Sequence, residues 1–221
     1  MALYIDSAFF ADIMRVAQTV PVVGVTTNPT LMLQAQERGQ GMKTQHLLNE
    51  LLRNTDGTIC IQPGAHTENE MYAQALAYIQ AAPERVIPKI PMTMVGMRIA
   101  RQLKQQNQRV AFTAVTSLAQ AYSAAMLGAD FVIPYYGRLE RNGVDAGERI
   151  AEMAELFHSQ QLPTRILAAS IKSPLDAMSA LCAGAHDITA APQVLLDMVS
   201  DPQTDEAMKK FTQDWQKLNK E

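Results

Sequence analysis

The chain has few cysteines, no excess of either charge and no long apolar run, and each shortage excludes a class of protein. Its only cysteines among 221 residues are Cys60 and Cys182, so a disulfide framework and a cysteine-rich metal site are both excluded. No apolar run approaches the roughly 20 residues that span a bilayer. The N-terminal MALYIDSAFF lacks the basic region of a signal peptide. We therefore expect a soluble, cytoplasmic protein without membrane contact, whose two thiols lie in the core.

Charge and motif content exclude further classes. The net charge is −3, from 19 basic and 22 acidic residues mixed along the chain, and no basic run indicates a nucleic-acid partner. Neither a Walker loop nor GxGxxG is present, which removes the usual nucleotide signatures. The histidines are His46, His66, His158 and His186. None stands in HExxH or a comparable spacing, so we expect no metal site.

Short apolar runs alternate with longer segments of helical pattern. The eight runs are residues 2–7, 22–28, 58–63, 86–91, 110–115, 131–136, 165–170 and 187–192. The helix-like spacers are residues 42–54, 68–81, 94–106, 118–128, 147–160 and 174–184. Strands that alternate with helices indicate parallel βα units, and eight units in this length predict a single-domain α/β protein, a (β/α)8 TIM barrel. An open doubly wound sheet is the alternative, and the prolines in runs four and six are unusual for ordinary strands.

One further helix is predicted at about residues 203–220, beyond the eighth unit. Met208, Phe211, Trp215 and Leu218 recur at steps of three and four, so they share one face of that helix. The periodicity leaves two possibilities open: the face packs on its own barrel or on a neighbouring subunit. With 48% hydrophobic residues and no linker, residues 1–221 are expected to form one domain.

Polar residues stand where the predicted strands end, and in parallel barrels catalytic groups lie at those ends. They are Asp6, Thr26, Thr27, Asn28, Gln62, Lys89, Thr113, Tyr135, Tyr136 and Ser170. Side chains alternate between the two faces of a strand, so Tyr4 shares a face with Asp6, and Ile87 shares one with Lys89. If these faces point inward, seven strands deliver polar groups to one barrel mouth.

Lys89 is the most informative of these residues, because it lies in the apolar run VIPKIP. A buried ion pair, or a side chain that extends to the rim, would account for it structurally. Burial among apolar neighbours also favours the neutral amine of a lysine. A neutral amine adds to a ketone and forms a Schiff base, whose iminium permits cleavage of the adjacent carbon–carbon bond without a metal.

Over its whole length the chain resembles the transaldolase family, and within it the short fructose-6-phosphate aldolase branch. The segments that carry the resemblance are LYIDSA, GVTTNPTLM, IPKIPMT, FTAVTSLAQA, IPYYGRLE, LAASIKSP and FTQDWQK. The combination of TTNP with a KxPxT lysine segment, in this order, is specific. The resemblance implies a class I aldolase without a cofactor that acts on a sugar or sugar phosphate.

The resemblance also implies a role for each site residue. Lys89 would form the Schiff base, and Asp6 would be the acid/base group at the reacting hydroxyl. Asn28 and Thr26 would bind the hydroxyls of the dihydroxyacetone part. Gln62, Thr113 and Tyr135 would hold the water that relays protons. Arg138 and Ser170, and less strongly Lys172, would hold a phosphate or distal hydroxyls.

Gln62 and Tyr135 favour an aldolase over a transaldolase, since larger transaldolases resemble this chain but have glutamate and phenylalanine there. A transaldolase, and a non-catalytic phosphosugar-binding barrel, remain alternatives. Ile133, Gly137 and Phe112 depart from the family pattern, and Ile133 is expected to narrow the donor pocket. In this branch the terminal helix reaches across a neighbour, so the resemblance implies a homo-oligomer, a decamer of two pentamer rings.

Overall fold

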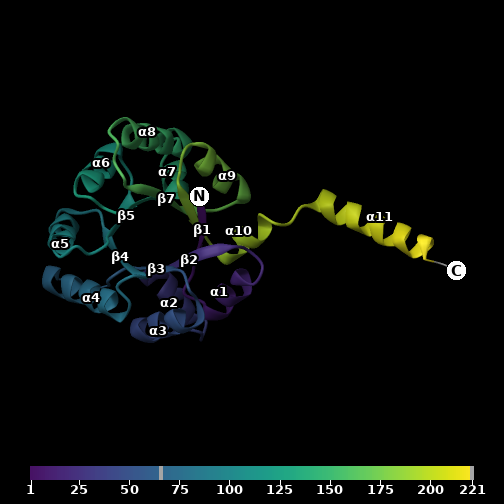
Figure 1. Ribbon diagram of the computed structural model, residues 1–221, viewed down its shortest axis with the longest axis horizontal. Coiled ribbons are helices and arrows are strands. Elements are labelled where there is room, and N and C mark those ends of the chain that lie inside the picture. Colours follow the sequence, from purple (N-terminus) through teal and green to yellow (C-terminus); the bar gives the residue numbers. More distant parts are fainter. Residues whose placement is uncertain (65–66, 220–221) are drawn as a thin grey trace.

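Eight parallel strands form a closed barrel in the computed structural model, which describes residues 1–64 and 67–219 (Figure 1). Each strand pairs with the next in sequence, and β8 pairs with β1. The strands are β1 (Ala2–Asp6), β2 (Val22–Thr26), β3 (Thr58–Ile61), β4 (Val86–Pro91), β5 (Ala111–Val115), β6 (Phe131–Pro134), β7 (Arg165–Ile171) and β8 (Asp187–Ala190). This confirms the predicted (β/α)8 barrel and excludes the open sheet.

Helices surround the barrel, and the six predicted spacers are all helical. Their bounds are α3 (Thr44–Asn54), α4 (Glu68–Ala81), α5 (Met94–Gln105), α6 (Leu118–Met126), α8 (Ala146–Ser159) and α9 (Pro174–Cys182). Four others were not predicted: α1 (Phe10–Ala17), α2 (Pro29–Glu37), α7 (Tyr136–Arg141) and α10 (Pro192–Asp197). These have six to nine residues.

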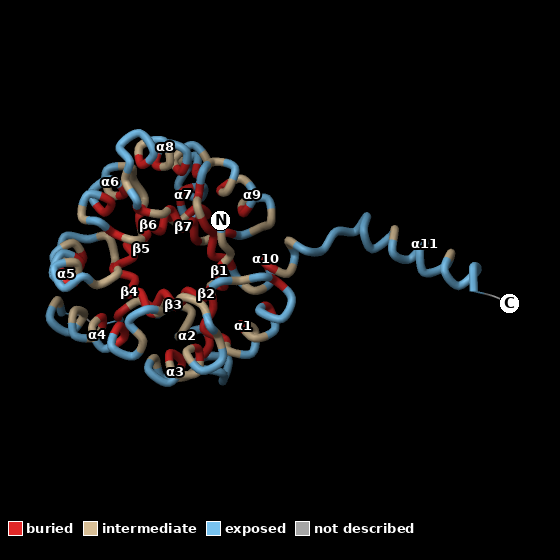
Figure 2. The backbone as a smooth tube through the Cα atoms, viewed as in Figure 1, coloured by how far each residue is buried: buried red, intermediate tan, exposed pale blue. Residues whose placement is uncertain are grey.

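The buried residues form two layers, and Figure 2 shows them along the strands and the inner helix faces. The barrel interior holds Tyr4, Cys60, Ile87, Ala111, Phe131, Ile133, Leu167 and Ala169. The layer between strands and helices includes Val86, Ile90 and Phe112. The predicted alternation along the strands is therefore confirmed. The prediction that both thiols are buried is wrong for Cys182, because it lies exposed at the end of α9.

The last helix, α11 (Pro202–Leu218), extends away from the barrel and buries none of its residues (Figures 1 and 2). Its predicted existence is confirmed, although position 220 of the expected range lies outside the described residues. In the structure this helix does not pack on its own barrel, and its packing on a neighbouring subunit stays a prediction. Within residues 1–64 and 67–219, no helix is both long and apolar enough to cross a membrane.

Candidate active site

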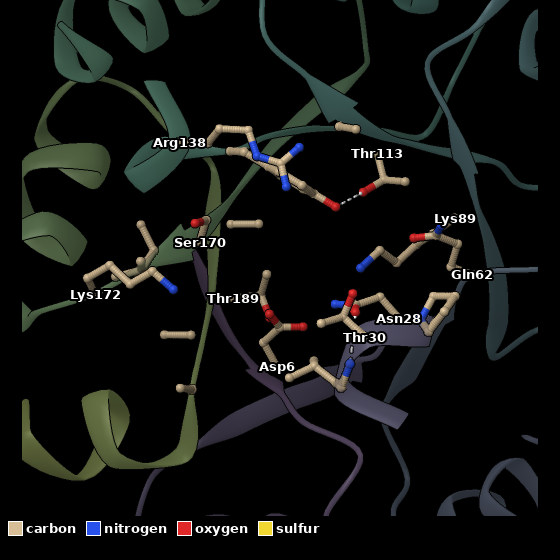
Figure 3. A pocket seen from close by; sticks show the side chains of 18 of the residues that line it. Asp6, Asn28, Thr30, Gln62, Lys89, Thr113, Arg138, Ser170, Lys172 and Thr189 are labelled. Carbon is tan, nitrogen blue, oxygen red and sulfur yellow. Dashed lines mark hydrogen bonds between the residues drawn. The ribbon is translucent and has the colours of Figure 1, made fainter. Parts of the chain in front are cut away.

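A pocket of about 600 Å³ opens at the carboxyl ends of the strands. It is lined by nine of the ten predicted site residues, namely Asp6, Asn28, Gln62, Lys89, Thr113, Tyr135, Arg138, Ser170 and Lys172. Figure 3 shows the side chains of Asp6, Asn28 and Lys89 converging on its open centre. Residues that are distant in sequence therefore meet in one place, as expected for polar groups at the strand ends of a barrel.

Lys89 is only 2% exposed and reaches the pocket floor from β4. Outward-facing Val86 and Ile90 pack against the helices, while Ile87 and Lys89 point inward. No carboxylate of the described residues forms an ion pair with Lys89. Below it, burial raises the pKa of Cys60 to about 12, so this thiol supplies no negative charge. The ion-pair explanation for a lysine at this position is therefore not supported.

Asp6 is held by a chain of hydroxyl groups. Thr26 Oγ1 donates a hydrogen bond to Asp6 Oδ1 at 2.7 Å and lies 2.7 Å from Thr189 Oγ1. Thr26 is fully buried and does not line the pocket. In this structure Thr26 contacts Asp6 and not the open pocket, so its predicted role in binding substrate hydroxyls stays a prediction. Thr189, which lines the pocket, was not predicted as a site residue, because nothing in DITAAP distinguishes it from a core threonine.

Asn28 contributes to both the fold and the pocket. It is the N-cap of α2, and its Oδ1 accepts a hydrogen bond from the backbone N–H of Leu31 at 3.1 Å. Pro29 follows at the first helical position, where a missing N–H is harmless. Since the oxygen is engaged in capping, the amide nitrogen of Asn28 is the group left to donate hydrogen bonds to a ligand.

Thr113 and Tyr135 also line the pocket, and their hydroxyl groups lie 3.0 Å apart. Figure 3 shows Thr113 on the side of the pocket opposite Asp6. Gln62 lines the same pocket. The prediction that the sixth strand reaches Tyr136 is wrong, because β6 ends at Pro134 and Tyr136 begins α7. Tyr135 lies between them: it is the N-cap of α7 and still forms an isolated parallel bridge with Ala169 of β7. Tyr136 is buried in the outer core.

The rim of the pocket is cationic. Arg138, Arg141 and Lys172 line it, and no ion pair of the described residues involves any of them. The guanidinium of Arg138 lies 4.7 Å from the centre of the Tyr135 ring. Arg141 was missed at the sequence level, although its spacing of three from Arg138 predicts a shared helix face. Such a rim suits a phosphate or another anion.

Two strand irregularities shape the pocket wall. Ala114 and Ser170 have positive φ angles of 60° and 62°, and both lie where the strand register shifts. A bulge redirects the neighbouring side chains and is common next to active sites. Ala114 and Ser170 both line the pocket. Ser170 therefore combines a left-handed backbone conformation with a position in the pocket lining.

The three residues that depart from the family pattern, Ile133, Phe112 and Gly137, lie in different parts of the barrel. Ile133 is fully buried in the barrel interior and does not line the pocket, so the expected narrowing by this side chain is not found. Phe112 packs against the helices. A Cβ atom at Gly137 would lie 2.5 Å from the carbonyl oxygen of Ser170, so this close approach of α7 to β7 requires glycine.

Metal ligands are not gathered in this region or elsewhere in the described part of the chain. There, no three His, Cys, Asp or Glu side chains come close enough to hold an ion. His66 lies outside the described residues. What the pocket offers instead is a buried amine, a carboxylate, several hydroxyl groups and a cationic rim.

Comparisons with known proteins identify the family that the chain matches. The family model described as transaldolase/fructose-6-phosphate aldolase matches residues 3–221. The chain is 36% identical over 220 residues to a probable transaldolase of Desulforudis audaxviator and 34% identical over 226 residues to probable transaldolase 2 of Bacillus anthracis. In both cases the match covers 100% of each chain.

Solved structures show a likeness in fold alone. An inosine 5′-monophosphate dehydrogenase from Legionella pneumophila superposes with a TM-score of 0.61 at 14% identity, covering 88% of this chain and 59% of that one. A mandelate oxidase variant gives a TM-score of 0.59 at 12% identity, covering 87% and 64%.

Proposed function

The chain belongs to the transaldolase/fructose-6-phosphate aldolase family, and we propose that it is a class I aldolase. The proposed reaction cleaves fructose 6-phosphate, or a closely related sugar, to dihydroxyacetone and glyceraldehyde 3-phosphate. The observation that carries the proposal is Lys89, a buried lysine without an ion-pair partner among the described residues, on the floor of a pocket with Asp6 and Asn28. A binding-only barrel has no need of this amine.

The proposed chemistry begins with addition of the Lys89 amine to the ketone carbon and loss of water to give an iminium. Asp6 takes the proton of the hydroxyl on the carbon that leaves. The carbon–carbon bond breaks, its electron pair moves toward the iminium to form an enamine, and the aldehyde departs. No cofactor is part of this sequence, because the iminium withdraws the electrons.

Release of dihydroxyacetone requires protonation of the enamine carbon and attack by water. The paired hydroxyl groups of Thr113 and Tyr135, with Gln62, offer donors and acceptors for a positioned water. Arg138, Arg141, Lys172 and Ser170 are the proposed partners of the phosphate. The Arg141 side chain donates to the backbone oxygen of Gly137 at 3.1 Å, which steadies it at the rim.

A transaldolase is the second candidate, and the names of the relatives favour it. It would pass the enamine to an acceptor aldose phosphate instead of hydrolysing it. Gln62 and Tyr135 support the aldolase, since a tyrosine hydroxyl can assist hydrolysis. Incubation with fructose 6-phosphate alone separates the two: an aldolase releases glyceraldehyde 3-phosphate in many turnovers, whereas a transaldolase stops near one per site until an acceptor is added.

A homo-oligomer is also proposed, and its expected form is a decamer of two pentamer rings in which α11 packs on a neighbour. Support comes from the exposed apolar face of α11. A cytoplasmic location is proposed because both cysteines are free.

Borohydride trapping tests the central step. The protein is incubated with dihydroxyacetone or fructose 6-phosphate, reduced, digested and mapped by mass spectrometry. We expect a reduced three-carbon adduct on Lys89. Lys89→Met removes the adduct and lowers cleavage by about 10⁴-fold, whereas Lys210→Met, a change on exposed α11, leaves both intact. Folded protein that gives no adduct on Lys89 with either sugar would contradict the proposal.

A further inference from the structure

We propose that Thr189 is a positioning residue that acts on Asp6 through Thr26. The inference rests on the proposed function, because it assigns Asp6 a proton-transfer role. In this proposal the two threonine hydroxyl groups hold the Asp6 carboxylate in one orientation, so that only one of its oxygens is free to take the substrate proton. The structural basis is a chain of three side chains from three adjacent strands: Asp6 on β1, Thr26 on β2 and Thr189 on β8.

The direction of this chain follows from its chemistry. An ionised carboxylate only accepts hydrogen bonds, and a threonine hydroxyl has one proton to donate. Thr26 donates that proton in its hydrogen bond to Asp6 Oδ1, at 2.7 Å. Its contact with Thr189 Oγ1, also 2.7 Å, is therefore one in which Thr189 donates and Thr26 accepts. The order of donation runs from Thr189 to Thr26 to Asp6.

Burial makes the chain difficult to replace by solvent. Thr26 and Thr189 both have 0% exposure, so water does not supply a substitute donor on the inner side of Asp6. A buried hydroxyl is costly unless it is hydrogen-bonded, and an apolar β-branched side chain would fit the same strand positions. The backbone register places Asp6 directly beside Thr26, and Thr189 beside Tyr4 one inward step below Asp6. Figure 3 shows Thr189 beside Asp6 in the pocket wall.

The consequence for the reaction concerns the location of the proton. Because Oδ1 accepts the hydrogen bond from Thr26, the proposal assigns the proton transfer to Oδ2 of Asp6. In the cleavage step the substrate O–H bond breaks and an O–H bond forms at Oδ2, while the electron pair of the carbon–carbon bond moves to the iminium. Without the hydroxyl chain the carboxylate can rotate, and the basic oxygen is no longer held against the substrate hydroxyl.

The test separates Schiff-base formation, which does not need Asp6 in this proposal, from carbon–carbon cleavage, which does. Thr189→Val removes the terminal donor while keeping the side-chain shape. We expect kcat for fructose 6-phosphate cleavage to fall about 10-fold, with borohydride trapping of dihydroxyacetone on Lys89 unchanged. Thr26→Val is expected to lower kcat at least as far, and the double variant no further than Thr26→Val, since both changes interrupt one chain. Thr189→Ser restores the hydroxyl and is expected to recover the rate.

Thr164→Val is the matched control. Thr164 is 1% exposed and donates to the backbone oxygen of Ala129 at 2.7 Å, outside the pocket lining, so its loss costs a buried hydrogen bond without touching Asp6. Cleavage by Thr189→Val within twofold of the wild-type rate overturns the proposal. So does a parallel fall in trapping and cleavage that Thr189→Ser does not recover. Thr189→Ala supplies the same comparison if the valine variant does not fold. A wild-type protein that forms no Lys89 adduct overturns the proposed function itself.

Discussion

Tyr135 is the residue at which the two candidate activities diverge. After cleavage both enzymes hold the same enamine, and the outcome depends on whether water or an aldehyde reacts with it. The Tyr135 hydroxyl lies 3.0 Å from that of Thr113, and the Arg138 guanidinium lies over its ring. The hydroxyl therefore has a fixed place in the pocket, and its removal changes hydrogen bonding with little loss of packing.

Tyr135→Phe is predicted to shift the enzyme from hydrolysis toward transfer. Because the Thr113 hydroxyl loses its partner and the water loses a donor, we expect acceptor-free release of glyceraldehyde 3-phosphate to fall about 100-fold. Exchange with an added aldose phosphate is expected to fall less than tenfold. Both rates are measured on one preparation with a coupled assay. Thr113→Val serves as a comparison, since it removes the other member of the pair. Equal losses in the two assays would contradict a selective role for Tyr135 in hydrolysis.

Cysteine reactivity gives a prediction that is independent of the substrate. Burial raises the pKa of Cys60 to about 12, although the nearby Lys89 opposes this shift, and the side chain has 0% exposure. The thiolate, which is the reactive form, is therefore almost absent at pH 8. Cys182 is exposed. We expect a thiol reagent to label Cys182 alone in the native protein and both cysteines after denaturation. Rapid native labelling of a Cys182→Ser variant would show that the barrel interior opens.

At the scale of elements, the motifs that follow the strands serve two purposes. Some of their residues line the pocket, and others are the N-caps of the helices that follow the strands. Asn28, Thr93 and Ser117 are N-caps whose side chains accept backbone N–H groups at 3.1, 3.0 and 3.2 Å. Each capped helix starts directly behind a strand end, so the caps fix the loops from which the pocket is built.

Gly137→Ala is predicted to weaken binding of the substrate phosphate at the cationic rim of the pocket, without affecting Schiff-base formation on Lys89. The added methyl group would lie 2.5 Å from the Ser170 carbonyl oxygen and 3.2 Å from a side-chain carbon of Lys172. Because the closer of these contacts is with a backbone atom, the methyl group fits only if the Ser170 backbone and the Lys172 side chain move. We expect KM for fructose 6-phosphate to rise about 10-fold, with trapping of unphosphorylated dihydroxyacetone unchanged. Gly147→Ala is the control, because its Cβ meets only the Asp145 side chain, at 3.3 Å. A change in trapping by Gly137→Ala would instead indicate general distortion.

The family resemblance predicted Arg138 and Lys172, whereas periodicity and strand-end position predicted the barrel and seven other residues that line the pocket, since both depend on local pattern and a simple alternation. What they could not predict depends on tertiary contacts. The positive φ angles of Ala114 and Ser170 arise at register shifts between strands. Thr26 looked like a pocket residue, but its hydroxyl is directed to Asp6 and Thr189, and Thr189 lies 163 positions further along the chain.

At the scale of the whole molecule, α11 is the feature that a single chain does not explain. Its 17 residues bury nothing, and Met208, Phe211, Trp215 and Leu218 are 55–80% exposed along one side. A helix of this length is marginal in water unless an apolar face is packed. An exposed apolar stripe of this kind is typical of an interface. The proposed oligomer gives the stripe a surface to cover it.

Removal of α11 is predicted to reduce the size of the assembly. A chain that ends at Ser200 loses the whole helix but keeps every residue that lines the pocket, so we expect a lower mass by light scattering with Lys89 trapping retained. A single change tests the same contact: Trp215→Asp places a charge on the apolar face, where burial would be costly. Gln213→Asp adds the same charge on the opposite side of the helix and is expected to leave the mass unchanged. If the truncated chain and Trp215→Asp both keep the wild-type mass, α11 does not hold the subunits together, and the assembly depends on the barrel surface instead.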